Sequence, residues 1–241
     1  MAVSYNPGVV TSGLVLALDA GNPKSYPGSG STWTDLSGNG YNFTVNSSAY
    51  SISGGIPHMN FEGSFGSAKR VVGGSLTNIP NFSNGTIMCF STILNSTTDW
   101  RTLVRGSSND HQVIVQVGTD NLGMYNNEPV EGFVDSTFDI TSLPNPYTQF
   151  NCLTFRLSQS SPYYQFQYNN DSTIYSITNA NATFNNGFCV IGAYHNFVTG
   201  TTSGDSSQYW GKISTFFYYN RHLTSSEISQ NFNALRGRFN I

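Results

Sequence analysis

Hydrophobic and polar residues alternate with a period of two along most of the chain. The clearest case is 111–117, HQVIVQV, in which valines fall on one face of an extended strand. Similar short apolar runs recur along the chain and are separated by turn-forming Gly, Asn, Ser and Pro. This pattern predicts an all-β protein built as a sandwich of two antiparallel sheets.

The alternation also gives the expected positions of the strands. Segments 100–105 and 112–117 are expected to pair as a hairpin, and 151–157 with 163–168 as a second pair, while 126–133 reads as a turn-rich insertion. The remaining predicted strands are 13–20, 56–63, 85–94, 122–125, 173–177, 187–193 and 212–219.

The last strand carries aromatic residues on both faces, which suits a strand inside a sheet rather than an exposed edge. Strict alternation predicts one face of Ile213, Thr215, Phe217 and Tyr219, and an opposite face of Ser214, Phe216 and Tyr218.

A short helix is predicted over 224–236, directly after this strand. Thr224 and Glu227 have the spacing of a capping box, in which each side chain accepts a backbone N–H of the first turn. Gly237 is expected to supply the left-handed cap at the end. Apolar residues at one-turn spacing form a stripe of Ile228, Phe232 and Leu235.

The ending of the chain resembles the last strand and helix of laminin-G-like, concanavalin A-like jelly-roll domains. His222 stands where that family usually has alanine. The agreeing residues, in order, are Gly211, Tyr219, Asn220, Arg221, Leu223, Thr224, Glu227 and Ile228.

The start of the chain strengthens this resemblance. The segment 13–40, GLVLALDAGNPKSYPGSGSTWTDLSGNG, is similar to a leader found in laminin-G-like domains of tailed-phage virion proteins. Two further segments resemble strands of the family, with Glu62 in place of Asp and Phe90 in place of Trp. The resemblance implies a two-sheet jelly-roll sandwich with one short C-terminal helix. We therefore expect an N-terminal arm at 1–12 and a single domain over 13–241.

Composition excludes several classes. Charged residues make up 10% of the chain and aromatic residues 14%, whereas disordered proteins have high charge and few aromatics. A formal charge of −3 gives no electrostatic footprint for nucleic acid or an anionic membrane. No apolar run reaches the roughly 20 residues of a membrane span, and the first residues lack the pattern of a secretory signal.

The three cysteines are far apart in sequence and show no CxxC spacing. Cys89, Cys152 and Cys189 each lie between strand-like residues, which favours buried free thiols over a disulfide or a metal site.

Catalytic patterns are missing from the sequence. Glucanases of the concanavalin A-like fold carry E-x-D-x-x-E on one strand, so that two carboxylates flank the glycosidic bond. The nearest pair here, Glu128 and Glu131, falls in a predicted loop. The four histidines are isolated, and His111 and His222 read as surface turn residues. We expect no enzymatic activity.

A calcium ion is an open alternative, because laminin-G-like domains often hold one through acidic and amide oxygens. Asp19, Asn22, Asp35 and Asn39 would supply such ligands if the two turns of the leader meet. The same residue types are ordinary turn formers, and Asp35 has the position for an Asx turn. No other cofactor or metal is expected.

Two loops rich in Asn, Gly, Ser and Tyr are candidates for recognition. The expected binding residues are Tyr125, Asn126 and Asn127 in the first loop and His195 and Asn196 in the second. We predict a non-enzymatic virion protein, a capsid decoration or a tail-fibre component, made in the host cytoplasm. Its partners would be other virion proteins and a host surface glycan, met in many copies. The alternatives are a carbohydrate-active enzyme or an exported lectin or adhesin of the same fold.

Overall fold

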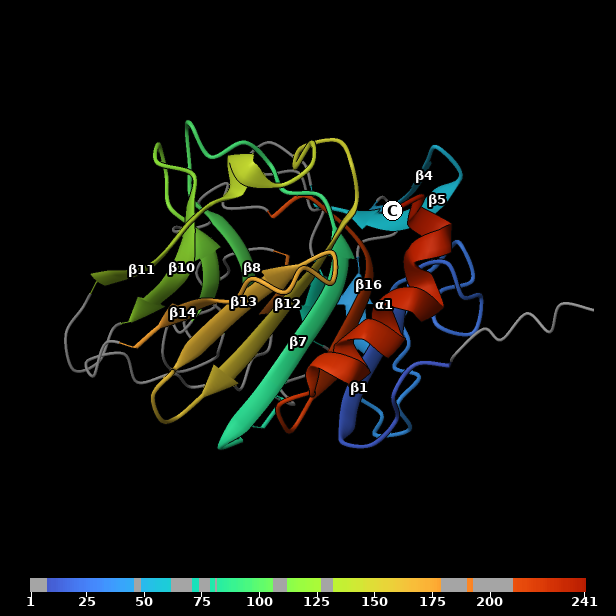
Figure 1. The fold of residues 1–241 in the computed structure, drawn as a ribbon. Coiled ribbons are helices and arrows are strands. Elements are labelled where there is room, and N and C mark those ends of the chain that lie inside the picture. The colour runs from blue at the N-terminus through green and yellow to red at the C-terminus, as the bar shows by residue number, and fades with distance from the viewer. Residues whose placement is uncertain are drawn as a thin grey trace, which may run out of the picture.

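Two antiparallel sheets face each other, and one helix covers the outer face of one of them (Figure 1). The computed structural model describes residues 8–45, 49–61, 71–73, 79–80, 82–105, 112–126, 132–178, 190–192 and 210–241. Within these ranges there is one α-helix, α1 (Ser225–Phe239), and one 3₁₀ turn, η3 (Ile140–Ser142). The predicted two-sheet antiparallel sandwich with a C-terminal helix is confirmed. No helix in the described ranges is long and apolar enough to span a bilayer.

The first sheet, sheet A, lies in the middle of the molecule. In this sheet, β1 (Leu14–Asp19) pairs with β16 (Lys212–Tyr219) but lies outside the linear order of the other strands. That order is β14 (Tyr175–Ile177), β13 (Tyr164–Tyr168), β12 (Asn151–Ser158), β7 (Asn84–Ser91), β16 (Lys212–Tyr219), β5 (Ile56–Asn60) and β4 (Tyr50–Ser53).

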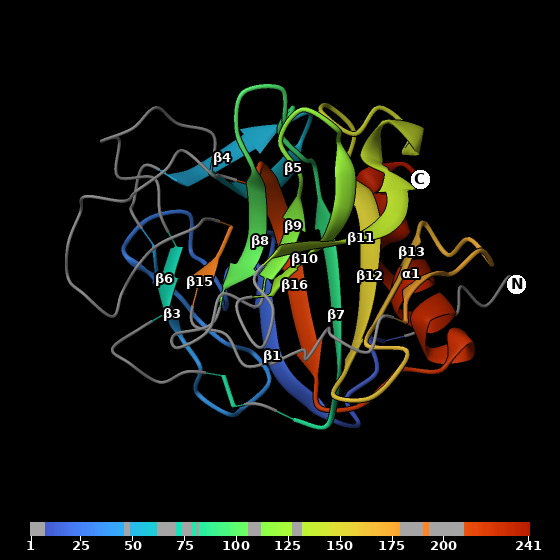
Figure 2. The same cartoon turned by 90° about the vertical axis from the view of Figure 1, so that its left-hand side faces the viewer.

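The second sheet, sheet B, forms the outer layer opposite α1, and Figure 2 shows its strands β8 to β11 in front of β7 and β16. Its order is β11 (Gly132–Asp139), β10 (Asn121–Asn126), β9 (Gln112–Val115), β8 (Arg101–Arg105), β15 (Val190–Ile191), β6 (Val71–Gly73), β3 (Phe43–Val45) and β2 (Thr32–Trp33).

All the predicted strands are present, and both predicted strand pairs are confirmed by the pairing of β8 with β9 and of β12 with β13. Several strands were not predicted. β2, β3, β4 and β6 are only two to four residues long, too short to show a period. β11 was missed for another reason: its register shifts against β10, so its sequence does not alternate cleanly.

The predicted faces of β16 are wrong at one residue. The register of β16 shifts between Ile213 and Thr215, so Ile213 joins Phe216 and Tyr218 in the core between the sheets. Phe217 and Tyr219 point to the other side, as expected. A bulge adds one residue to a strand, so the side chains before it and after it no longer follow one alternation. A prediction based on strict alternation cannot foresee this change of phase.

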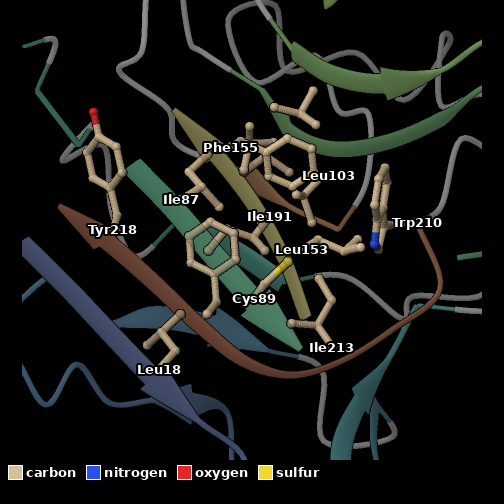
Figure 3. Close-up of a cluster of buried hydrophobic side chains, with 14 of the residues drawn as sticks. Leu18, Ile87, Cys89, Leu103, Leu153, Phe155, Ile191, Trp210, Ile213 and Tyr218 are labelled. Carbon is tan, nitrogen blue, oxygen red and sulfur yellow. The ribbon is translucent and has the colours of Figure 1, made fainter. Parts of the chain in front are cut away.

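The main core fills the space between the two sheets. Figure 3 shows Ile87, Cys89, Leu153 and Phe155 of sheet A meeting Leu103 and Ile191 of sheet B. Trp210 closes one end of this core, and its indole Nε1 donates to Ser91 Oγ at 3.1 Å. The next residue, Gly211, has φ +146, and a Cβ there would lie 2.5 Å from the Thr92 carbonyl oxygen, so this position favours glycine.

A second core joins sheet A to α1. Phe90 of β7 stacks on Phe239 of the helix, with ring centroids 4.3 Å apart. The Phe232 ring lies nearly parallel to Phe90 at a centroid distance of 6.4 Å, and Phe217 and Tyr219 complete the layer. The predicted stripe is therefore the docking face of the helix.

The capping box of Thr224 and Glu227 is confirmed, and Glu227 also forms an ion pair with Arg221 at 2.6 Å. The predicted end of the helix is wrong. Gly237 is helical, and Asn240 takes the left-handed cap with φ 56. The helix continues because Phe239, four residues after Leu235, adds another buried ring to the stripe.

Residues 8–12 of the predicted N-terminal arm pack against the helix. The Val10 N–H donates to Asn231 Oδ1 at 2.7 Å, and its carbonyl accepts from the Tyr219 hydroxyl at 3.0 Å. Asn231 in turn donates to the Tyr219 hydroxyl at 3.0 Å. This buried network ties the chain start to α1. The boundary at residue 12 stays a prediction.

Two of the three cysteines are buried free thiols, as predicted. Cys89 points into the core between the sheets, whereas Cys152 points toward α1. Burial raises the pKa of the Cys89 thiol to about 12, so this group stays protonated and unreactive. Cys189 lies outside the described residues.

Candidate functional site

The outer face of sheet B combines partly exposed aromatic rings with polar side chains. On β10, Leu122 and Met124 point into the core, so Gly123 and Tyr125 point outward. On β11, Val134 packs against the core, which places Phe133 on the outer side with Tyr125, its partner in register. This outer surface is the candidate site.

Three rings form an aromatic cluster there: Trp100, Tyr125 and Phe133. The Trp100 ring meets Phe133 at a centroid distance of 5.5 Å and Tyr125 at 6.1 Å, both in edge-to-face geometry. All three side chains are partly exposed. Aromatic rings at a water-exposed surface present large rigid contact areas, which is why they are common in binding sites.

Gly123 lets the cluster form. A Cβ at Gly123 would lie 2.7 Å from the Phe133 ring and would clash with the Val134 carbonyl oxygen. The missing side chain leaves a hollow in the sheet surface, and the Phe133 ring fills it. Any larger residue at this position would displace Phe133 and break the cluster.

A turn at the start of β8 positions Trp100. Its backbone N–H donates to Asp99 Oδ1 at 2.9 Å. The next residue, Arg101, is buried, and its Nε donates to the Asn95 carbonyl at 2.8 Å. Burial lowers the pKa of the Arg101 guanidinium, which nevertheless stays charged between Asp99 and Asp120. Attraction between the Arg101 guanidinium and the carboxylates of Asp99 and Asp120 therefore stabilises the turn.

A carboxylate and an amide form a polar rim on the same face. Asp135 pairs with Gly123 in register and therefore points outward, and Asn121 Nδ2 donates to Asp135 Oδ2 at 2.7 Å. Asp135 Oδ1 accepts the Thr137 N–H at 2.6 Å. The carboxylate is exposed and held in one orientation.

Thr137 adopts a strained backbone beside this rim. Its φ is 64, a conformation that β-branched residues rarely adopt. The shift in register between β10 and β11 falls at the same place, and Ser136 Oγ bridges it by donating to the Leu122 carbonyl. Bulges and strained residues concentrate where a sheet re-aims side chains for function.

The sequence-predicted binding residues are only partly placed. Tyr125 lies in the aromatic cluster, although on a strand and not in a loop. Asn126 ends β10, and only its backbone is described. Asn127, His195 and Asn196 lie outside the described residues. Sequence reasoning missed Trp100, Phe133 and Asp135, because their shared face depends on a pairing of β11 that its sequence conceals.

The four leader residues considered as calcium ligands serve separate structural roles. Asp19 pairs with Arg238 at 2.6 Å, and Asn22 caps the Lys24 N–H at 3.0 Å. Asp35 makes the predicted Asx turn with Ser37 and also accepts the Ala17 N–H; the corresponding distances are 2.8 and 2.9 Å. Asn39 donates to the Val15 carbonyl at 3.0 Å.

These contacts fix the leader against β1. The oxygens of the two carboxylates accept hydrogen bonds from the chain itself, and the calcium alternative stays a prediction. The part of the chain that the structure describes also contains no group of three or more His, Cys, Asp or Glu residues suited to a metal.

Two histidines are described, and neither is a free surface group. His58 is fully buried, with Nδ1 2.9 Å from the Ile56 carbonyl. His222 lies in the turn before α1, as predicted, but it is half-buried and not fully at the surface, with Nε2 3.1 Å from the Leu157 carbonyl. Burial lowers the pKa of His222. His111 lies outside the described residues.

Comparisons with known proteins support the fold. A scan against protein-family models finds no match, and a search of curated proteins finds none either. Among solved structures, a mutant of Trypanosoma rangeli sialidase displaying trans-sialidase activity is similar, with 12% identity and a TM-score of 0.58. The match covers 96% of this chain and 34% of the sialidase.

Two toxin domains are similar as well. The binding domain of botulinum neurotoxin DC, in complex with SialylT, has 14% identity and a TM-score of 0.55, over 94% of this chain and 52% of that chain. The binding domain of Paraclostridial mosquitocidal protein 1 has 16% identity and a TM-score of 0.53. The match covers 92% of this chain and 52% of that chain.

At these identities the likeness shows the fold alone, an antiparallel β-sandwich. The chain spans between a third and about half the length of these structures.

Proposed function

We propose that this protein is a non-enzymatic, lectin-like module that binds a neutral glycan on the outer face of sheet B. The observation that carries the proposal is the shared face: an aromatic cluster and the Asp135–Asn121 pair point outward from neighbouring strands. Its ligand would lie across β10 and β11, with Trp100 and Tyr125 on one side and Asp135 on the other.

The chemistry of the face fits a sugar ring. One side of a pyranose presents C–H groups, which pack against aromatic rings, and its rim presents hydroxyls. The Asp135 carboxylate accepts hydrogen bonds from neighbouring hydroxyls, and charge-assisted bonds of this kind are the strong ones. The exposed Asp135 carboxylate gives the face a negative charge, which favours a neutral sugar over a carboxylated one.

The fold comparison supports recognition of glycans. A toxin binding domain of similar fold is in complex with SialylT, and a sialidase structure of similar fold is in complex with sialic acid. Fold does not fix function, so the proposal depends on the site.

The proposed absence of catalysis rests on the sequence. Most glycosidases flank the bond with an acid and a second carboxylate, about 5 Å apart in retaining enzymes, whereas sialidases use a tyrosine as the nucleophile. No strand carries the E-x-D-x-x-E run of the glucanases. Glu128 and Glu131 lie outside the described residues.

We further propose that the module is displayed in many copies on a virion. This rests on the resemblance of the leader and of the ending to phage domains, and on no structural observation. Repetition on a particle would turn weak single-site binding into tight attachment. Mass spectrometry of purified particles tests this part; absence of the chain from intact particles would contradict it.

The binding proposal is tested on an array of neutral and acidic glycans, with Trp100→Ala and Asp135→Asn as variants. We expect the wild type to select neutral glycans and each variant to lose at least tenfold in affinity, about 1.4 kcal/mol. Asp171→Asn is the matched control, because exposed Asp171 makes the same Asx contact, to the Thr173 N–H at 2.7 Å, in the turn between β13 and β14.

The outcomes test three parts of the proposal: where the glycan binds, whether the effect is specific to this face, and whether the protein is non-enzymatic. If folded Trp100→Ala and Asp135→Asn bind like the wild type, the glycan does not lie on sheet B. If the control loses as much as Asp135→Asn, the effect is not specific to this face. Turnover of the bound glycan would overturn the non-enzymatic part.

A further inference from the structure

A row of polar residues crosses the outer face of sheet A, on the opposite side of the molecule from the aromatic cluster. Phe155 and Tyr164, which precede members of the row on their strands, belong to the main core, so the row points toward the side of α1. Figure 1 shows α1 over this face, with β12 to β14 to one side of the helix. The residues of the row are paired in register on neighbouring strands: Thr86 (β7), Arg156 (β12), Gln165 (β13) and Ser176 (β14).

Arg156 brings a positive charge to the start of α1. The residue is 9% exposed, and its Nε donates to the Leu223 carbonyl at 2.9 Å, directly before Thr224, the N-cap of the helix. The two other guanidinium nitrogens, Nη1 and Nη2, have no hydrogen bond or ion pair with any described residue. Neither is among the fully enclosed unpartnered atoms of the described residues, so solvent reaches both.

No carboxylate among the described residues balances the Arg156 charge. Burial lowers the pKa of both Arg156 and Arg101, but only at Arg101 do carboxylates oppose this shift, those of Asp99 and Asp120. A guanidinium stays charged in a protein, and burying a charge without a counter-charge is unfavourable. An anion bound at Arg156 would offset this cost.

The first turn of α1 supplies further donors. The capping box uses the N–H of Thr224, which donates to Glu227 Oε2, and the N–H of Glu227, which donates to Thr224 Oγ1. The N–H groups of Ser225 and Ser226 have no acceptor among the described residues, and both serines are exposed. Glu227 is paired with Arg221 at 2.6 Å, so its negative charge is already compensated. The N-terminus of a helix favours anions.

We propose that Arg156 and the first turn of α1 form a binding site for a tetrahedral oxyanion, a phosphate or sulfate group. Nη1 and Nη2 of Arg156 would contact two of its oxygens, as guanidinium groups commonly do with phosphate. The N–H groups of Ser225 and Ser226 would contact the other oxygens, and the half-buried amide of Gln165 would add a donor. Donors on both a strand and a helix suit four oxygens better than the two of a carboxylate.

The test titrates sodium phosphate and sodium sulfate into the whole chain by isothermal titration calorimetry at constant ionic strength. Sodium malonate, a dicarboxylate of similar charge, is the comparison, and we expect both oxyanions to bind at least tenfold more tightly than malonate. Arg156→Met keeps an apolar stem and removes the guanidinium, so it should lower oxyanion affinity at least tenfold. Arg236→Met removes an exposed arginine from the last turn of the same helix; this matched control should bind like the wild type.

A second variant covers a folding failure of Arg156→Met. Ser225 is the first residue of α1, where proline is favoured, and the extended backbone of Thr224, with ψ 162, suits a residue before proline. Ser225→Pro therefore removes one donor N–H and preserves the helix, and we expect a severalfold loss of oxyanion affinity. Ser225→Ala keeps the N–H and should retain binding. Unchanged affinity in folded Arg156→Met or in Ser225→Pro, or malonate binding as tight as that of the oxyanions, would overturn the inference.

Two further probes distinguish a free anion from one esterified to a sugar. If glucose 6-phosphate and glucose 6-sulfate bind as tightly as the inorganic ions, the site is assigned to ester groups; if they bind more weakly, it is assigned to free anions. Both results support the site, provided that Arg156→Met loses the binding.

The inference goes beyond the proposed function and does not depend on it. Trp100→Ala should leave the affinity for phosphate and sulfate unchanged even where it abolishes the binding of a neutral glycan. Loss of oxyanion binding in folded Trp100→Ala would place the anion on sheet B and overturn the inference, whereas failure of glycan binding alone would overturn only the proposed function.

Discussion

The two sheets of this protein both carry aromatic residues on their outer faces, but in the part of the chain that the structure describes only one of these faces is covered by a helix. On sheet A, Phe90 and Phe217 are at most 4% exposed, because Phe232 and Phe239 of α1 pack over them. On sheet B, the aromatic cluster of Trp100, Tyr125 and Phe133 remains partly exposed.

The same residue type therefore has two roles. Rings buried under α1 contribute free energy of folding, whereas rings left at the surface are available for contact with another molecule. The difference comes from the capping box, which starts the helix over sheet A. The following predictions test this contrast, in order of decreasing effect.

The largest effect is expected from removing a ring beneath the helix. Phe232→Ala should lower the free energy of unfolding by about 3–5 kcal/mol, because it leaves a cavity in the second core. Phe133→Ala on sheet B should cost less, about 1–2 kcal/mol, since this ring is partly exposed already. Urea denaturation of both variants checks the contrast; equal losses would mean that the two faces do not differ as described.

The strain at Thr137 should be removable. Thr137→Gly frees the residue from its unfavourable φ of 64 and should raise the free energy of unfolding by about 1 kcal/mol. Thermal denaturation measures the gain. Thr141→Gly in η3 provides the control and should not stabilise. If Thr137→Gly destabilises, the bulge is not strained.

The cap of α1 should make a contribution of similar size. Thr224→Ala removes the acceptor of the Glu227 N–H and should cost about 1 kcal/mol. Its loss should not affect glycan binding on sheet B, because the cap lies on sheet A. A combined loss of stability and binding would show that the two faces are coupled.

The smallest effect is a pH dependence. Arg221 lowers the pKa of Glu227 to about 2, from 4.5. The contribution of this pair is complete above about pH 4.5 and is lost as pH falls toward 2. The pair lies near the surface, so the loss should stay below about 1 kcal/mol. Wild type should lose more stability than Glu227→Gln across this window; parallel curves would contradict the assignment.

Much of the fold followed from the sequence, since alternation and capping are local signals. The hairpin of β8 and β9 and the cap at Thr224 could be found in this way. Features that depend on strand pairing could not be predicted. The bulge at Ser214 places Ile213 on the opposite face from the one expected, and the bulge in β11 concealed the strand that carries Phe133 and Asp135.

The candidate site shows the same limit. Tyr125 could be chosen from loop composition, but its neighbours Phe133 and Asp135 lie on a strand that the sequence pattern did not reveal. Gly123 is a local signal in retrospect, because a glycine inside a strand marks a place where another group approaches closely. The end of α1 depends on the packing of Phe239 against Phe90, a contact that only the folded structure shows.

The central claim, that sheet B presents its aromatic cluster to a glycan, is tested most directly by tryptophan fluorescence. The chain has three tryptophans, of which Trp33 and Trp210 are fully buried and Trp100 is partly exposed. Acrylamide should quench mainly Trp100, and a bound neutral glycan should protect it. Trp100→Phe should abolish both the quenching and the protection. A glycan that binds tightly while Trp100 stays equally open to acrylamide would contradict the account.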